Sequence, residues 1–150
     1  FLPRIGLCAA LDKSYENMSF YGYGPQESYT DKRFACSRDF YDTIVSDNFV
    51  HYVKPQENGS HYGTNYARVT DGKTEITLES EQGFSFNLSP YDAATLEKTA
   101  HDDQLPASEK NYLYADYFMS GIGSNSCGPR LNKRWQTPGK GNGKITLIIK

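Results

Sequence analysis

Apolar and polar residues alternate over short stretches of this chain, which is the pattern of β-strands with one buried face. The alternation is clear over residues 17–23, and again over residues 83–88, where Phe84, Phe86 and Leu88 share one face. Residues 4–11 and 144–150 are more uniformly apolar, and the first of these is predicted to be a largely buried strand. The remaining strands are expected at residues 65–70, 74–79 and 111–119, with extended stretches within 40–53.

Turn and cap signals connect these stretches. Asp71-Gly72 stands between two of the expected strands and predicts a hairpin. Ser89-Pro90 predicts the start of a short helix over residues 91–101, with Ser89 as N-cap and Pro90 at the first helical position. Short strands with one short helix favour a mainly β fold, an antiparallel β-sandwich.

Composition narrows the class of protein further. The 150 residues fit one domain, and the 12 Tyr and 8 Phe favour strands over helices. A net charge of −2 gives no reason to expect nucleic acid, and no apolar run approaches the roughly 18 residues of a membrane helix. The chain begins at Phe1 without Met or a signal-peptide pattern, so we expect it to be a piece of a longer protein.

The cysteines and histidines predict no metal site. The three cysteines are odd in number, lie far apart and form no CxxC motif, and the three histidines form no ligand cluster. We interpret the cysteines as free thiols in a reducing compartment, the cytoplasm. These residues are Cys8, Cys36, Cys127, His51, His61 and His101.

Catalytic chemistry finds little support in the residue pattern. A glycosidase needs two carboxyl groups about 5–9.5 Å apart; the candidates are Glu27, Asp31, Glu57 and Asp116, which we interpret as solvated or capping groups. Cys127 with His51 or His61 would be needed for thiol catalysis, and nothing in the spacing favours it. The abundant Tyr, Asn and Gln residues suit carbohydrate binding, although most of the tyrosines are expected in the core or in cross-strand pairs.

The stretch from Tyr114 to Pro129 is the most informative part of the chain. An expected strand ends at Met119, and three glycines, a proline and small polar residues follow between Ser120 and Pro129. Glycine permits positive φ angles and has no Cβ, so such a loop can bring its backbone close to a ligand.

Four motifs together resemble one family. They are Arg4-Ile-Gly-Leu, Gly22-Tyr-Gly-Pro-Gln-Glu-Ser-Tyr-Thr-Asp31, Tyr52-Val-Lys-Pro-Gln-Glu-Asn-Gly59 and Gly121-Ile-Gly-Ser-Asn-Ser-Cys-Gly-Pro129. In this order and near this spacing they resemble the C-terminal part of the large bacterial β-galactosidases of glycoside hydrolase family 2. The resemblance covers nearly the whole chain.

The resemblance implies a fold and a set of partners. Residues 1–150 would be the second half of a large antiparallel β-sandwich, a galactose-mutarotase-like supersandwich, that ends a multidomain enzyme. The catalytic barrel with both glutamates would lie outside this chain, and the partners would be the remaining domains and other copies of the whole enzyme. The family's Mg and Na ions are expected to be bound mostly by those other domains, and no cofactor is expected here.

The resemblance also implies the site residues. The family has a loop at residues 121–129 that reaches the sugar pocket, so Ser124, Asn125, Ser126 and Cys127 are the predicted substrate-binding residues. The best-known members carry a sugar-stacking Trp near the position of Cys127, which matches after a one-residue gap. Here that surface is lost or supplied elsewhere, and Trp135 is expected in the following strand.

The sequence thus predicts part of an enzyme that hydrolyses terminal β-galactosides such as lactose. This chain is expected to supply packing and one loop, to contain no catalytic residue and to be inactive alone. Two alternatives remain: a carbohydrate-binding β-sandwich module with no enzyme attached, and a purely structural domain whose loop touches no ligand.

Overall fold

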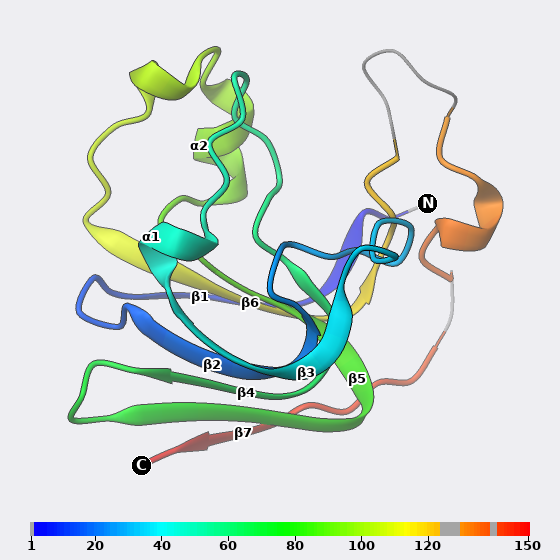
Figure 1. Ribbon diagram of the computed structural model, residues 1–150, viewed down its shortest axis with the longest axis horizontal. Coiled ribbons are helices and arrows are strands. Elements are labelled where there is room, and N and C mark those ends of the chain that lie inside the picture. The colour runs from blue at the N-terminus through cyan, green and yellow to red at the C-terminus, as the bar shows by residue number, and fades with distance from the viewer. Residues whose placement is uncertain (1, 124–129, 139–140) are drawn as a thin grey trace.

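The computed structural model describes residues 2–123, 130–138 and 141–150, and these form a strongly bent antiparallel sheet with short helices at its margins (Figure 1). The strands within these residues are β1 (Arg4–Asp12), β2 (Asn17–Gly24), β3 (Ser37–Ile44), β4 (His61–Thr70), β5 (Glu75–Ser89), β6 (Lys110–Met119) and β7 (Thr146–Ile149). The helices are α1 (Val45–Asn48), α2 (Ala93–Lys98) and the 3₁₀ turns η1 (Asp102–Gln104) and η2 (Lys133–Trp135).

All the strands belong to one hydrogen-bonded sheet in the order β1-β6-β5-β4-β2-β3, and β7 pairs with β5 beside this path. Every named pair is antiparallel. The predicted mainly β, antiparallel class is therefore confirmed. The expected hairpin is present as well: β4 and β5 pair on either side of Gly72, whose φ of 86° is a conformation that glycine adopts without strain.

Strand β5 makes the bend. Its first half, residues 75–79, lies between β4 and β7, whereas residues 85–89 pair with β6. The register with β4 shifts between these halves, and Gly83 in the gap has a φ of 80°. What the sequence predicted as two strands is therefore one long strand, because a glycine-containing irregularity turns the chain without ending its pairing.

The core fills the concave face of this bent sheet. Phe20 of β2, Ala67 of β4, Leu78 and Phe86 of β5 and Ala115 of β6 are fully buried there. The alternation predicted for β2 is reproduced, since every second residue of that strand is buried. Side chains that alternate along each strand thus meet as one continuous apolar layer.

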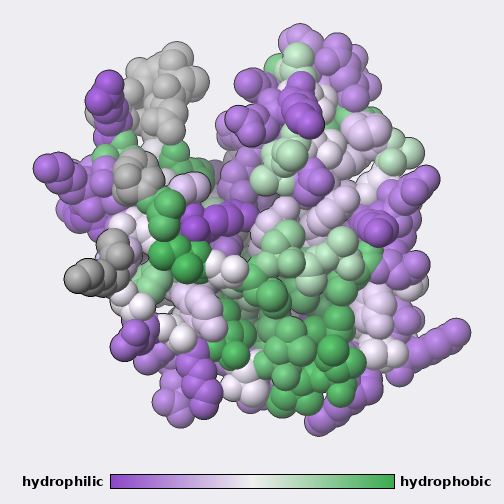
Figure 2. Space-filling view, turned by 180° about the vertical axis from the view of Figure 1, so that it is seen from behind, coloured by the Kyte–Doolittle hydropathy of each residue, from purple (hydrophilic) through white to green (hydrophobic). Residues whose placement is uncertain are grey.

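The two strands β1 and β7 are more exposed than their composition predicts. Leu7, Leu147 and Ile149 are 45%, 44% and 65% exposed. Their partners in the register, Ala115, Leu78 and Ile76, all belong to the buried cluster, so these three residues lie on the core face of the sheet. We call Leu7, Leu147 and Ile149 the apolar seam. Figure 2 shows that apolar side chains gather on the face of the molecule seen from behind the view of Figure 1.

The prediction that residues 4–11 form a largely buried strand was therefore wrong in its burial, although the strand itself is present. Strand β1 lies at the edge of the sheet and pairs with β6 along one side only within the described part of the chain. An apolar composition predicts a strand, but it does not indicate whether other residues of the same chain cover that strand.

The helix predictions were partly wrong. Helix α2 is shorter than expected, and its N-cap is Asp92, whose Oδ1 accepts a hydrogen bond from the Thr95 N–H at 2.6 Å. Ser89 instead accepts a hydrogen bond from the Tyr91 N–H one turn earlier. The four-residue helix α1 was not expected. Among the described residues, no helix is long and apolar enough to cross a membrane.

Candidate functional site

The predicted sugar-binding residues Ser124, Asn125, Ser126 and Cys127 lie outside the described residues. The structure does describe both flanks of this segment, residues 120–123 and 130–138, and the residues that hold them. The first flank leaves the sheet at the end of β6, near the N-terminus, and the second contains η2 (Figure 1).

Four residues close the flanks onto each other, and we call Ser120, Gly121, Trp135 and Thr137 the loop base. The Gly121 N–H donates to the Trp135 carbonyl at 2.8 Å, and the Thr137 N–H donates to the Ser120 Oγ at 2.8 Å. The Ser120 hydroxyl donates in turn to the carbonyl of Leu2 at 2.9 Å. Ser120 and Thr137 are both buried, so the loop between them begins and ends at fixed points of the fold.

Trp135 was expected in the following strand, but it lies in η2. Asn132 caps this 3₁₀ turn by accepting a hydrogen bond from the Arg134 N–H. Strand β7 begins only at Thr146. Trp135 thus belongs to the loop base, where its carbonyl is used for closure.

The first residues of the loop are bound by Asp31. The Asp31 carboxylate accepts hydrogen bonds from the N–H groups of Ile122, at 3.1 Å, and Gly123, at 2.8 Å. Asp31 belongs to residues 25–36, which we call the anchor segment. From the sequence, Asp31 was considered as a catalytic acid and interpreted as a solvated or capping group, because no local pattern indicates which distant backbone its carboxylate binds.

Arg33 of the anchor segment contacts the other flank. Its guanidinium lies 4.8 Å from the ring centre of Tyr62, 5.8 Å from that of Tyr23 and 6.0 Å from that of Trp135. It also donates a hydrogen bond to the Thr30 carbonyl at 2.7 Å. One short segment therefore contacts both flanks of the predicted sugar loop, through Asp31 on one side and Arg33 on the other.

The buried carboxylate of Glu27 holds the anchor segment in place. It accepts hydrogen bonds from Lys32 and Tyr52, and from the Gly59 N–H at 2.9 Å. Burial alone would raise the pKa of Glu27, but these hydrogen bonds outweigh burial and keep the pKa below its ordinary value. Glu27 is therefore a structural anion that ties the two Pro-Gln-Glu motifs together, and its oxygens are occupied within the fold.

A second ionic group lies beneath the loop base. Arg4 donates to Glu57 at 2.7 Å, and its Nε lies 3.6 Å from an oxygen of Asp116. Burial raises the pKa of Asp116 to about 6 and also raises that of Glu57, in both cases against the opposing charge of Arg4. The carboxyl groups considered as glycosidase acids are thus committed to Lys32, Arg4 or backbone N–H groups.

The histidines are likewise engaged. The ring nitrogens of His61, which is fully buried, lie 3.1 Å from the Tyr23 carbonyl oxygen and 2.7 Å from the Asn48 amide. Burial lowers the pKa of His61 to about 4, so the ring is neutral near pH 7. His51 pairs with Asp102 at 2.8 Å. Neither His51 nor His61 is therefore free to act with Cys127 in the thiol catalysis considered from the sequence.

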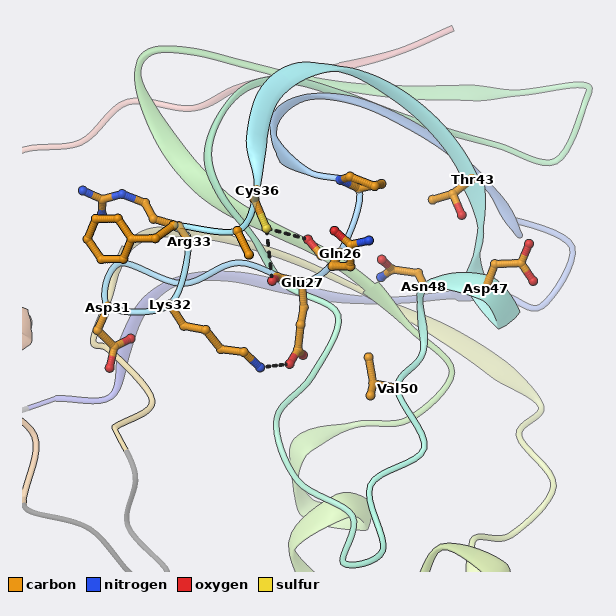
Figure 3. A pocket seen from close by; sticks show the side chains of 13 residues that line it. Gln26, Glu27, Asp31, Lys32, Arg33, Cys36, Thr43, Asp47, Asn48 and Val50 are labelled. Atoms are coloured by element: carbon orange, nitrogen blue, oxygen red, sulfur yellow. Dashed lines mark hydrogen bonds and ion pairs between the residues drawn. The ribbon is translucent and has the colours of Figure 1, made fainter.

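A cavity of about 830 Å³ lies on the other side of the anchor segment (Figure 3). Gln26, Phe34, Cys36, Thr43, Asn48 and Val50 are among its lining residues. Figure 3 shows Lys32 reaching to Glu27 at this cavity, while Asp31 lies apart, toward the segment that follows β6. The Glu27 carboxylate at this cavity is already occupied by its own partners, and the exposed residue Asp47 also lines the cavity.

Comparisons with known proteins agree on one family. The family model described as beta galactosidase small chain matches residues 1–149. Among curated relatives, a beta-galactosidase of Staphylococcus xylosus is 43% identical over 136 residues and one of Actinobacillus pleuropneumoniae is 44% identical over 136 residues. A beta-galactosidase of Kluyveromyces lactis is 34% identical over 131 residues.

These alignments cover 91%, 91% and 86% of this chain. They cover only 14%, 13% and 12% of the respective relatives, so the chain corresponds to about one seventh or one eighth of the proteins it matches. A match over almost every residue here, with a sheet of the expected class, leaves little of the chain unexplained. The chain belongs to the beta galactosidase small chain family.

Proposed function

We propose that this chain is the C-terminal β-sandwich region of a β-galactosidase of glycoside hydrolase family 2. The whole enzyme hydrolyses terminal, non-reducing β-D-galactosides such as lactose. The observation that carries this proposal is the family match over residues 1–149, together with relatives named beta-galactosidase that are several times longer. The free thiols of Cys8 and Cys36 suit an enzyme that acts in the cytoplasm.

The catalytic glutamates come from another part of the enzyme. Retaining glycoside hydrolysis needs two carboxyl groups with access to the sugar. Glu27 is buried and bound by four donors, and Glu57 is paired with Arg4. The isolated chain is therefore inactive.

The contribution of this chain to the sugar pocket is the 121–129 loop. The loop base and the anchor segment support this role, since they fix the two flanks by backbone and buried side-chain hydrogen bonds. A loop whose ends are held in this way can be aimed at a pocket built by other parts of the enzyme. Ser124, Asn125, Ser126 and Cys127 are its sugar-contacting residues.

The apolar seam is the surface by which the chain packs against the rest of its enzyme. The seam continues the core layer of the sheet into the open, and Phe34 and Val53 are 86% and 82% exposed elsewhere on the molecule. Apolar side chains on a sheet face gain stability when another layer covers them. The whole enzyme further assembles from several copies, with its Mg and Na ions bound outside this chain; among the described residues, no three His, Cys, Asp or Glu side chains gather in a way that fits a metal ion.

The test compares two proteins on one substrate. The full-length enzyme that contains this chain should release nitrophenol from nitrophenyl β-galactoside, with competition from lactose. The purified 150-residue chain should give no turnover above a heat-inactivated control. An inactive full-length protein that still binds galactosides would instead favour a carbohydrate-binding module, and turnover by the chain alone would contradict the assignment of the catalytic groups to other domains.

A further inference from the structure

We propose that Asp31 is a positioning residue for the β-galactosidase reaction, which holds residues 121–123 at the start of the loop assigned above to the sugar pocket; this inference rests on the function proposed above. Its carboxylate accepts the two successive N–H groups of Ile122 and Gly123. A carboxylate that accepts two charge-assisted hydrogen bonds from successive N–H groups fixes the backbone of the residues that donate them, here Ile122 and Gly123. Asp31 touches neither substrate nor reacting atoms and acts through the loop.

Gly121 has a specific reason to be glycine in this arrangement. A Cβ atom on Gly121 would lie 2.4 Å from Cγ of Asp31 and within 2.6 Å of both carboxylate oxygens. Real Cβ atoms are essentially never found so close to another heavy atom. The first glycine of the Gly-Ile-Gly motif therefore admits the Asp31 carboxylate, and the second, Gly123, turns the chain with a φ of 64°.

The turn that carries Asp31 is itself rigid. Tyr29 and Lys32 exchange backbone hydrogen bonds of 2.8 and 3.0 Å, so Asp31 lies within a closed turn. Tyr29 is 1% exposed, and the Ser28 N–H donates to the Ser60 carbonyl at 2.7 Å. Because the carboxylate is presented by a fixed turn, it can impose its geometry on the loop more than the loop imposes on it.

The second contact of the anchor segment supports the same role. Arg33, two residues after Asp31, contacts the ring of Trp135, and the Trp135 carbonyl accepts the hydrogen bond from Gly121. Asp31 and Arg33 therefore contact opposite flanks of the same loop. Loss of either contact would leave the sheet intact and release one flank of the loop.

A double-mutant cycle in the full-length enzyme tests the coupling between Asp31 and Gly121. Asp31→Ala removes the two acceptors, and Gly121→Ala displaces the carboxylate by steric conflict. We expect each single variant to raise KM for nitrophenyl β-galactoside by about tenfold, the equivalent of two lost hydrogen bonds to a charged acceptor with partial replacement by water. In the Asp31→Ala background there is no carboxylate left to displace, so Gly121→Ala should change KM by less than about twofold.

Two further variants serve as an intermediate case and as a control. Asp31→Asn keeps one acceptor oxygen and should lie between the wild type and Asp31→Ala in KM. Asp39→Ala is the matched control, because Asp39 is an exposed carboxylate whose side chain, within the described part of the chain, bonds only to the adjacent Phe40 N–H. It should leave KM, kcat and Tm unchanged.

Trypsin cleavage after Arg130, an exposed residue on the far flank, gives a readout that needs no activity. Cleavage should be faster in Asp31→Ala and Gly121→Ala and no faster still in the double variant, with Tm changed little because the sheet is untouched. If the wild type had no galactosidase activity, the proposed function would fail while the cleavage cycle still measured the coupling. Equal effects of Gly121→Ala in both backgrounds, or unchanged KM and cleavage in Asp31→Ala, would overturn the role of Asp31.

Discussion

The carboxylate of Asp116 lies 3.6 Å from the guanidinium Nε of Arg4, and yet its pKa is raised to about 6, above the ordinary value of 3.8. Only 4% of this side chain is exposed, and the loss of hydration outweighs the attraction of the positive charge. The ion pair therefore does not by itself make an ionised Asp116 favourable. This balance makes the stability of the fold depend on pH in a definite direction.

The free energy of unfolding should rise on mild acidification by a contribution from Asp116. Between about pH 4 and about pH 6, the folded state holds a proton on Asp116 that the unfolded state has released, so this contribution is present below pH 4 and is lost as the pH rises to 6. A difference of about two pKa units corresponds to roughly 3 kcal/mol. Urea unfolding of the 150-residue chain and of Asp116→Asn across this range measures it. The difference between the two curves should change with pH in this window, and a constant difference would contradict the raised pKa.

Removal of Arg4 should destabilise the fold strongly, because it leaves the buried carboxyl group of Asp116 and the half-buried one of Glu57 without their cation. For Arg4→Met we expect a loss of about 2–3 kcal/mol, less than for a fully buried pair because a quarter of the arginine is exposed. Arg68→Met is the matched control: its pair with Glu75 is about two-fifths exposed on both sides, so its loss should stay below about 1 kcal/mol. Acidification should restore part of the Arg4→Met loss, as Asp116 and Glu57 take up protons.

Gly6 of β1 lies tightly against the backbone of β6. A Cβ at this position would lie 2.4 Å from the Ala115 carbonyl oxygen and 2.5 Å from the Asp116 Cα, and these backbone atoms cannot swing aside as a side chain can. Gly6→Ala should therefore destabilise the sheet by about 1–3 kcal/mol and speed amide hydrogen exchange along β1 first. Ala10→Ser, at an exposed position of the same strand, should change stability by less than about 0.5 kcal/mol. Equal effects of the two substitutions would show that β1 has room at Gly6.

The strands could be predicted from the sequence because their alternation and the Asp71-Gly72 turn are local signals. The path of β5 could not, since Gly83 reads equally well as the end of one strand or as a kink within it. The N-cap of α2 was misplaced for a similar reason. Ser89 and Asp92 both suit a cap, and the geometry that gives the cap to Asp92 forms only when Ser89 ends β5.

The contacts that hold the candidate site together could not be predicted from the sequence. The glycine-rich loop and the anchor segment were both identified as motifs, but the bond between Asp31 and the loop joins residues 92 positions apart. No periodicity encodes such a contact, and the same carboxylate reads as a solvated turn residue when its partner is unknown. The acids Glu27 and Glu57 were likewise interpreted as solvated groups until the fold placed Lys32 and Arg4 beside them.

The apolar seam predicts that the 150-residue chain associates with itself when it is separated from the rest of its enzyme. Leu7, Leu147 and Ile149 extend the core layer into solvent on two strands, and an exposed sheet face of this kind is covered by any apolar surface available, a second copy included. Sedimentation should show mass rising with concentration. Combined replacement of the three residues by Thr, which keeps the β-propensity, should restore a monomer. Phe34→Ser removes a more exposed ring from the anchor segment and should leave the association unchanged; a monomeric wild-type chain, or equal loss of association in this control, would show that the seam is not the contact surface.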